Sequence, residues 1–283
     1  RLNLMYDSIV TRPATWADLP ACLEVEHAAM KANHYLADVA DLYFNGTVGD
    51  LTVAEVDGKI VGIGKLTLLY DGSAWLETLR VDPAYQGNGV GKAIYRRYLE
   101  EAAELNAPAL RMYTGVKNAV SAGLARRHGF TIHCTCREMT LRLDDSPILE
   151  TRFHRVGQDT ACRLLAPLAD AWRGFLCFNR TFYAMNEPLY RGLAYEGKVY
   201  REEASGSILV AGTRFQHKKA LHVALVEGDV DRCIAAAKTI ARERGIPQLT
   251  VMFPYDNQVL EEKLASLGFE TAPSDFISMG MYR

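Results

Sequence analysis

Hydrophobic and polar positions in the first half of the chain follow the period of strands in some segments and of helices in others. The first pattern predicts strands over residues 8–12, 51–56, 59–69, 75–81, 110–114 and 131–143. The second predicts helices over residues 15–30, 92–105 and 118–128. Asp57-Gly58 is a strong signal for a hairpin turn between the second and third strands. This order of elements predicts a mixed α/β fold.

The pattern recurs in the second half of the chain at a fixed distance. Five residues each have an identical residue 139 positions later: Pro108, Leu110, Asn118, Gly129 and Phe130. Their counterparts are Pro247, Leu249, Asn257, Gly268 and Phe269. Such self-similarity predicts two related domains, over residues 6–145 and 150–283, joined by the turn-rich residues 144–147.

Composition narrows the expected partners. The 283 residues carry a formal net charge of −2 with both signs interleaved, so neither nucleic acid nor an anionic membrane is an expected partner. No apolar run approaches the roughly 18 residues of a membrane span. The close pair Cys134 and Cys136 lacks the spacing and the second ligand pair typical of zinc sites. We expect reduced thiols in a cytoplasmic protein and no bound metal, and the sequence leaves the oligomeric state open.

The most informative segment runs from a predicted strand through a glycine-rich loop directly into a helix. Alternating glycines over 87–91 let the backbone approach a ligand closely, and the helix start adds the positive end of a dipole. This combination suits a phosphate or pyrophosphate. A nucleoside-triphosphate loop would need Gly at Gln86 and Ser or Thr at Ala93, and a dinucleotide fingerprint would need Gly at Lys92. Both patterns therefore fail.

A third phosphate-binding pattern fits. Gln86-x-x-Gly89-x-Gly91, after a Leu-x-Val-x-Pro strand end, closely resembles motif A of the GCN5-related N-acetyltransferases. Asn118, Leu124 and Gly129-Phe130 stand where that family has its next conserved element. The resemblance covers about 135 residues in the right order of elements. It implies a tandem acetyltransferase fold and acetyl-coenzyme A as the co-substrate.

The resemblance also implies roles for individual residues. Backbone groups of Leu79, Arg80 and Val81 would pair with the pantetheine arm as an added strand does, and the Leu79 amide would stabilise the oxyanion. The pyrophosphate would be held by a continuous run of residues: Gln86, Gly87, Asn88, Gly89, Val90, Gly91 and Lys92. Asn118 would contact the pantetheine end.

The acceptor amine must lose a proton to attack a thioester, which calls for a base. We predict Glu77, because strand alternation places it on the same side as Leu79 and Val81; a structural glutamate is the alternative. The family's frequent Tyr acid is replaced by Ala125, which leaves the acid unassigned. Tyr113 is a candidate, and the thiolate could also leave unaided.

Acceptor contacts are predicted for His27, His34 and Tyr35, which occupy the region that shapes the acceptor pocket in this superfamily; ordinary polar packing is the alternative. Six aromatic residues crowd the segment 172–190, where they could form a core or line that pocket. In the second half Glu227-Gly228-Asp229 replaces the glycine-rich loop and is six residues shorter. Its two carboxylates oppose pyrophosphate binding, so we expect a degenerate copy.

We therefore expect an N-acetyltransferase that moves an acetyl group from acetyl-coenzyme A to a primary amine of a small molecule. Residues 50–63 and 76–81 resemble histidine N-acetyltransferases, which also carry a degenerate second half, so an amino acid is the leading acceptor. Two alternatives stay open. One is a protein N-terminal or lysine acetyltransferase, and the other is a non-enzymatic acetyl-coenzyme A sensor.

Overall fold

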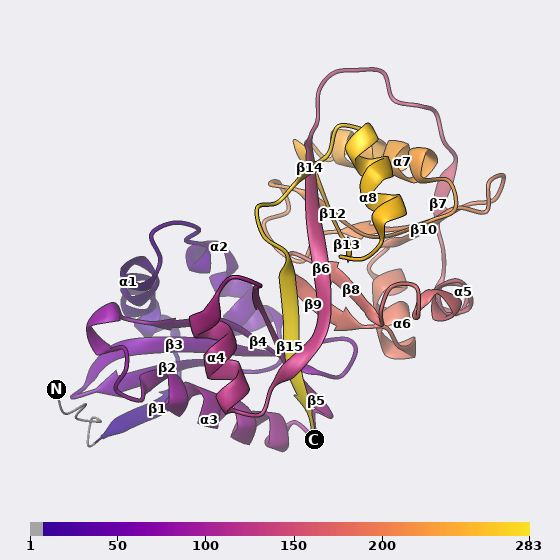
Figure 1. Cartoon of the computed structure of the whole chain (residues 1–283). Helices are drawn as coiled ribbons and strands as arrows, with labels where there is room; N and C mark the ends of the chain where they lie inside the picture. Colours follow the sequence, from indigo (N-terminus) through magenta and orange to yellow (C-terminus); the bar gives the residue numbers. More distant parts are fainter. Residues whose placement is uncertain (1–7) are drawn as a thin grey trace. The chain divides into compact units, whose positions relative to one another are not determined.

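The computed structural model describes residues 8–283 (Figure 1). The chain divides into two compact units that are each built from more than one segment. Unit 1 holds the residues up to Met112, together with Gly123–Thr131 and Gly280–Arg283. Unit 2 holds Tyr113–Ala122 and Ile132–Met279. The predicted boundaries, 6–145 and 150–283, describe the sequence repeat and stay a prediction.

Unit 1 is a mixed sheet with helices. Its strands are β1 (Ile9–Pro13), β2 (Leu51–Val56), β3 (Lys59–Leu68), β4 (Ala74–Val81) and the first part of β5 (Ala109–Gly115). They lie in chain order, antiparallel from β1 to β4 and parallel between β4 and β5. The helices are α1 (Leu19–Ala29), α2 (Leu36–Asp41), α3 (Val90–Glu104) and the end of α4 (Ala119–Arg127). The predicted hairpin is confirmed, and α2 was missed.

Two glycines of β3 let helix α3 approach the sheet closely. A Cβ atom added to Gly62 would lie 2.7 Å from Val90 Cγ1, and one added to Gly64 would lie 2.3 Å from Tyr98 Oη. Real Cβ atoms do not come this near to other atoms, so any side chain would push the helix away. The start of α3 is thereby fixed beside the end of β4.

The strand that lies beside β5 in the sheet is not the predicted one. Residues 131–143 were expected to close the first sheet, but β6 (Thr131–Arg142) pairs with β13 (Gln248–Pro254) from Cys136 to Arg142, within unit 2. The neighbour of β5 is instead β15 (Phe276–Tyr282), whose end belongs to unit 1. Arg283 N donates to Pro108 O at 2.9 Å, and its guanidinium donates to Ala102 O at 2.9 Å. Strand pairing depends on distant residues, which local periodicity does not report.

Unit 2 repeats the strand–helix–strand arrangement of unit 1. Its sheet runs in the order β15-β6-β13-β12-β11-β10-β7. Its other strands are β7 (Phe153–Arg155), β10 (Val199–Glu202), β11 (Ile208–Gly212), β12 (Leu221–Glu227) and β14 (Glu270–Thr271), with β8 (Phe175–Phe178) and β9 (Thr181–Ala184) as a separate hairpin. The helices are α5 (Gln158–Leu165), α6 (Glu187–Tyr195), α7 (Val230–Glu243) and α8 (Gln258–Ser266). Helix α7 connects the parallel strands β12 and β13, as α3 connects β4 and β5.

The repeated residues have the same structural roles in both halves. Asn118 Oδ1 accepts a hydrogen bond from Ser121 N, and Asn257 Oδ1 accepts one from Leu260 N, both at 3.1 Å, so each asparagine caps a helix. Gly129 and Gly268 end these helices with φ values of 86° and 95°. The repeat therefore preserves helix ends, whose geometry is needed with or without a ligand.

The aromatic residues of segment 172–190 lie in the core of unit 2. All six are buried, with at most 8% of the surface of any of them exposed: Trp172, Phe175, Phe178, Phe182, Tyr183 and Tyr190. This finding supports the packing interpretation.

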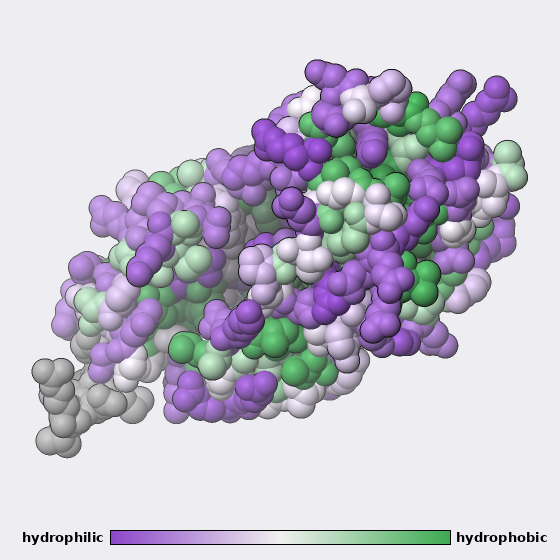
Figure 2. Space-filling model, turned by 45° about the horizontal axis from the view of Figure 1, so that its top comes forward, coloured by the Kyte–Doolittle hydropathy of each residue, from purple (hydrophilic) through white to green (hydrophobic). Residues whose placement is uncertain are grey.

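The surface is mixed in character. On the face drawn in Figure 2, apolar residues appear in groups among hydrophilic ones. No helix within residues 8–283 is long and apolar enough to cross a bilayer.

Candidate active site

A β-bulge interrupts strand β4 at the point where catalytic residues were predicted. Ile63 pairs with Arg80 and Lys65 pairs with Glu77, so two residues of β4 stand opposite one residue of β3. Thr78, inside the bulge, has a φ of 57°, which is uncommon for a β-branched residue. Such strained positions occur at ligand-binding and active sites, where the surrounding structure holds them.

The bulge changes which side chains share a face of the sheet. Simple alternation predicted that Glu77 and Leu79 share one. Because cross-strand partners point to the same face, the register instead puts Glu77 and Arg80 together, on the face of Ile63 and Lys65. The opposite face carries Gly62 and Gly64 and is covered by α3. The predicted common face of Glu77 and Leu79 is therefore wrong, because the extra residue shifts the alternation.

The carboxylate of Glu77 is held by the neighbouring strand. Thr67 Oγ1 donates a hydrogen bond to Glu77 Oε2 at 2.7 Å, and only 9% of the surface of Glu77 is exposed. The hydroxyl of Tyr98, from α3, donates to the Glu77 carbonyl oxygen at 3.4 Å. A buried carboxylate with a fixed orientation is suited to accept a proton from a substrate placed beside it.

Of the three predicted acceptor contacts, Tyr35 reaches the bulge. Its hydroxyl lies 2.9 Å from Thr78 Oγ1, which is also 2.6 Å from the hydroxyl of Tyr43. Tyr35 is positioned by the buried carboxylate of Glu26, which accepts hydrogen bonds from the backbone N–H groups of Tyr35 and Leu36 at 3.3 and 3.1 Å. The carboxylate satisfies donors at the start of α2, and the segment from α1 to α2 is thereby tied down.

The two histidines lie before Tyr35 in this segment. Their rings pack in a tilted arrangement with centroids 3.9 Å apart, and His34 Nε2 lies 2.6 Å from Met30 O. His27 is exposed and His34 is half-buried. Their role as acceptor contacts stays a prediction, whereas the hydroxyl of Tyr35 is already directed to β4.

The glycine-rich loop leads into an uncapped helix. Gly87 and Gly89 have φ values of 78° and 95°, and Gly89 occupies the N-cap of α3 without a side-chain hydrogen bond. The first-turn N–H groups of this 15-residue helix are therefore not occupied by a capping side chain. A Cβ added to Gly87 would meet nothing within 4 Å. These features fit an approaching anion such as a pyrophosphate.

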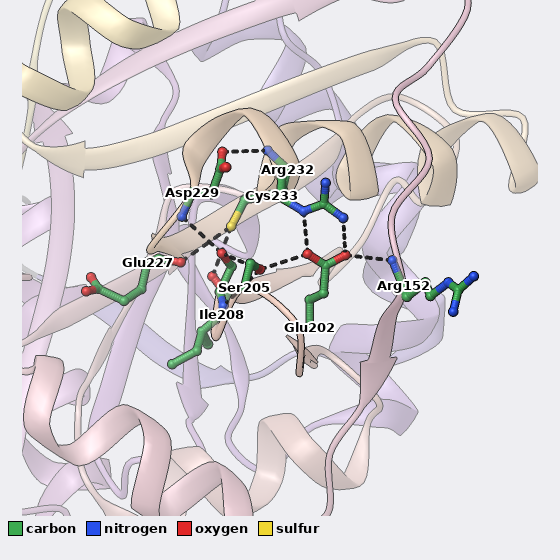
Figure 3. Close-up of polar contacts among 9 residues, drawn as sticks. Arg152, Glu202, Ser205, Ile208, Glu227, Asp229, Arg232 and Cys233 are labelled. Atoms are coloured by element: carbon green, nitrogen blue, oxygen red, sulfur yellow. Dashed lines mark hydrogen bonds and ion pairs between the residues drawn. The ribbon is translucent and has the colours of Figure 1, made fainter.

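The corresponding turn of unit 2 is filled by the chain itself. Two residues separate β12 from α7, whereas eight separate β4 from α3. Asp229 caps α7 by accepting from Arg232 N at 3.2 Å. Beside it the buried carboxylate of Glu202 accepts from the guanidinium of Arg232 and from Arg152 N, the latter at 2.7 Å (Figure 3). In unit 2 a carboxylate and a capping side chain thus occupy the region around the start of α7. The corresponding region at the start of α3 in unit 1 is not filled in this way.

Two of the predicted residues, Tyr113 and Asn118, belong to unit 2. Tyr113 lies on β5, with its ring 6.1 Å from that of Phe276, and hydrogen bonds with Arg180. Arg180 in turn stacks on Phe276 and forms a two-bond ion pair with Glu138. The amide side chain of Asn118 is engaged as a helix cap, so its predicted pantetheine contact has a structural competitor.

Sequence reasoning missed Glu26, Thr67 and Tyr43, which support the site from outside the motif. All three are buried, and each has a polar group that forms a hydrogen bond in or beside the site. Buried polar groups need such partners, but these pairings are visible only in the folded chain, and the surrounding sequence does not mark the residues. Thr78 carried no sequence signal either, because its left-handed backbone comes from the register of β3 and β4.

The chain is similar to known acetyltransferases. Residues 16–130 match the model of the acetyltransferase (GNAT) family. An amino-acid acetyltransferase of Mycobacterium tuberculosis is 31% identical over 125 residues, which are 43% of this chain and 68% of that protein. The N-acetylaspartate synthetase of Rattus norvegicus is 32% identical over 126 residues, 42% of each chain.

Comparison with solved structures shows that the similarity of fold covers both units. A tandem GNAT protein from the clavulanic acid biosynthesis pathway has a TM-score of 0.62 at 15% identity, covering 97% of this chain and 98% of that one. At this identity the likeness shows the fold alone, a tandem GNAT fold. Together with the family match and the relatives, it leads to one conclusion: the chain belongs to the GNAT family and is an acetyltransferase.

Proposed function

We propose that this enzyme transfers an acetyl group from acetyl-coenzyme A to the primary amine of a small molecule, with an amino acid as the leading acceptor. The observation that carries the proposal is the contrast between the two helix starts. Helix α3 begins at an uncapped, glycine-rich turn, whereas α7 is capped by Asp229 and has Glu202 beside it. One helix start suits the pyrophosphate of coenzyme A, and the other repels it.

The proposed reaction is a direct attack on the thioester. The amine nitrogen forms a bond to the carbonyl carbon, the carbon–sulfur bond breaks, and coenzyme A leaves as a thiolate, which then takes up a proton from water. Glu77 accepts the amine proton directly or through water, and Thr67 holds its carboxylate in place. The backbone N–H of Leu79, one of the two bulge residues, is the proposed donor to the oxyanion.

An amino acid acceptor is supported by the names of two relatives of the chain. One is named an amino-acid acetyltransferase and the other an N-acetylaspartate synthetase, so both names concern N-acetylated amino acids. The segment that matches the family model, residues 16–130, includes α1, β4 and the glycine-rich loop. It therefore includes the candidate base and the predicted acceptor contacts.

Release of free thiol from acetyl-coenzyme A, measured against a panel of acceptors, tests the proposal. The panel holds amino acids, simple amines, and peptides with free N-termini or lysines. We expect release with small amines and amino acids. Release with peptides alone would favour the protein acetyltransferase alternative, and acetyl-coenzyme A binding without release for any acceptor would favour the sensor.

A further inference from the structure

Arg80 is a cation beside the candidate base, and no residue within 8–283 is its anionic partner. It is half-buried, and its Nε–H is buried without a hydrogen-bond partner in this part of the chain. The guanidinium donates one hydrogen bond, from Nη1 to Leu79 O at 2.9 Å, and lies over the ring of Tyr35 with 5.9 Å to the ring centroid. Among the described residues it forms no ion pair. Burying an uncompensated charge is costly, so such an arrangement favours binding of an anion.

The coenzyme phosphates are poorly placed to be that anion. The register places Arg80 on the face of Ile63 and Lys65, and its guanidinium lies on the ring of Tyr35. Helix α3, whose start would hold the pyrophosphate, covers the opposite face at Gly62 and Gly64. The cation is therefore directed to the side of the sheet where acceptor contacts are predicted.

Arg80 and Glu77 are separated only by the bulge residues and share this face. Thr78 lies between them in the sequence, and its hydroxyl is hydrogen-bonded to that of Tyr35. An α-amino acid carries its amine and its carboxylate on one carbon atom. A molecule with its amine at Glu77 would present its carboxylate on the side of Arg80, whose planar guanidinium matches a carboxylate through two parallel hydrogen bonds.

We infer that the Arg80 side chain binds the α-carboxylate of the acceptor and thereby selects amino acids over simple amines. This inference rests on the proposed function and adds the residue that recognises the acceptor. The backbone of Arg80 remains available to the cofactor, because only its side chain is directed to the acceptor. Tyr35 packs against the guanidinium and keeps it oriented.

The test compares each amino acid with the amine that lacks its carboxylate, for example histidine with histamine and tyrosine with tyramine. Thiol release is measured for the wild type, for Arg80→Met and Arg80→Lys, and for Arg96→Met. Arg96 is exposed on α3 and loses the same charge outside the site, so it serves as the control. Affinity for acetyl-coenzyme A and thermal unfolding are measured for every variant.

We expect the wild type to prefer amino acids. Arg80→Met should lower kcat/KM for amino acids about 100-fold, mainly through KM, because a buried hydrogen-bonded charge pair is lost. The amines should change less than about threefold, and affinity for acetyl-coenzyme A should stay at the wild-type value. Arg80→Lys keeps the charge but cannot form two parallel hydrogen bonds, so its kcat/KM for amino acids should lie between those of the wild type and of Arg80→Met. This variant also provides the test if the Met variant does not fold.

Equal losses for amino acids and amines would overturn the inference, as would a wild type without preference. Weaker acetyl-coenzyme A binding with unchanged preference would also overturn it, by assigning the side chain to the coenzyme. In each case thiol release itself continues, so the proposed acetyl transfer to a small-molecule amine stands. Absence of release with every acceptor would instead overturn the proposed function, and this inference with it.

Discussion

Thr67 Oγ1 donates a hydrogen bond of 2.7 Å to Oε2 of Glu77, from one strand to the next. A donor to the charged carboxylate stabilises that form. Thr67→Val keeps the shape of the residue and removes the donor. We expect the acidic limb of the kcat/KM profile to move to higher pH, with a smaller loss of kcat than Glu77→Gln causes. Thr11→Val on β1 is the control, and an unchanged profile for Thr67→Val would show that the hydrogen bond is only structural.

Glu77→Gln tests the base itself. The amide cannot accept the proton, so kcat should fall roughly 10²- to 10⁴-fold while acetyl-coenzyme A affinity stays close to wild type. Steady-state kinetics and calorimetry on the same preparation separate the two quantities. Full activity of the variant would mean that water or another residue removes the proton.

Gly91→Glu tests the pyrophosphate loop. A Cβ added here would lie 3.4 Å from Leu124 Cδ2, an ordinary contact, so the fold should be retained. The new carboxylate stands at the uncapped helix start, where it should repel the pyrophosphate and abolish binding of coenzyme A in calorimetry. Gly157→Glu in unit 2, at another open position, adds the same bulk and charge and should bind normally. Unchanged affinity in Gly91→Glu would contradict the assignment.

Glu202→Gln tests the filled turn of unit 2. Hydrogen bonds from the guanidinium of Arg232 lower the pKa of Glu202 to about 2. Its ionised form therefore stabilises the fold above the ordinary pKa near 4.5, and this contribution is lost as the pH falls towards 2. The variant should lose about 3 kcal/mol of unfolding free energy at pH 7, and less at pH 3. Exposed Glu203→Gln is the control, and an equal loss at both pH values would argue against the ion pair.

Glu101→Gln tests a buried carboxyl on α3. Burial raises the pKa of Glu101 to about 7. Its Oε2 is buried and has no hydrogen-bond partner among the residues that the structure describes, while Oε1 accepts from Asp50 N at 2.6 Å. The folded state then holds a proton that the unfolded state has released above about pH 4.5. Stability should therefore fall as the pH rises from 4.5 through 7. The Gln variant should lack this decline and be more stable than wild type at pH 8, whereas exposed Glu100→Gln should follow the wild-type curve. Denaturant unfolding across this pH range would measure it.

The sequence by itself determined the features that are local. The Asp57-Gly58 turn predicts the hairpin of β2 and β3, because the two central turn residues require positive φ values, 52° and 77° here. The two asparagine caps and the glycine helix ends follow from side chains and φ angles within a few residues. The second half lacks the glycine-rich loop, and the sequence shows this because the offset between corresponding residues changes there. The size of that change gives the number of missing residues.

The tertiary structure decided the features that join distant residues. The bulge at Thr78 arises from the register of β4 against β3, and it put Glu77 on the face of Arg80 and not on that of Leu79. The strand beside β5 came from the end of the chain, and the carboxylate of Glu26 fixed Tyr35. Periodicity reports which residues are apolar, whereas register and partnership depend on the other strand or helix. That Arg80 has no ion-pair partner within residues 8–283 could therefore be read only from the folded chain.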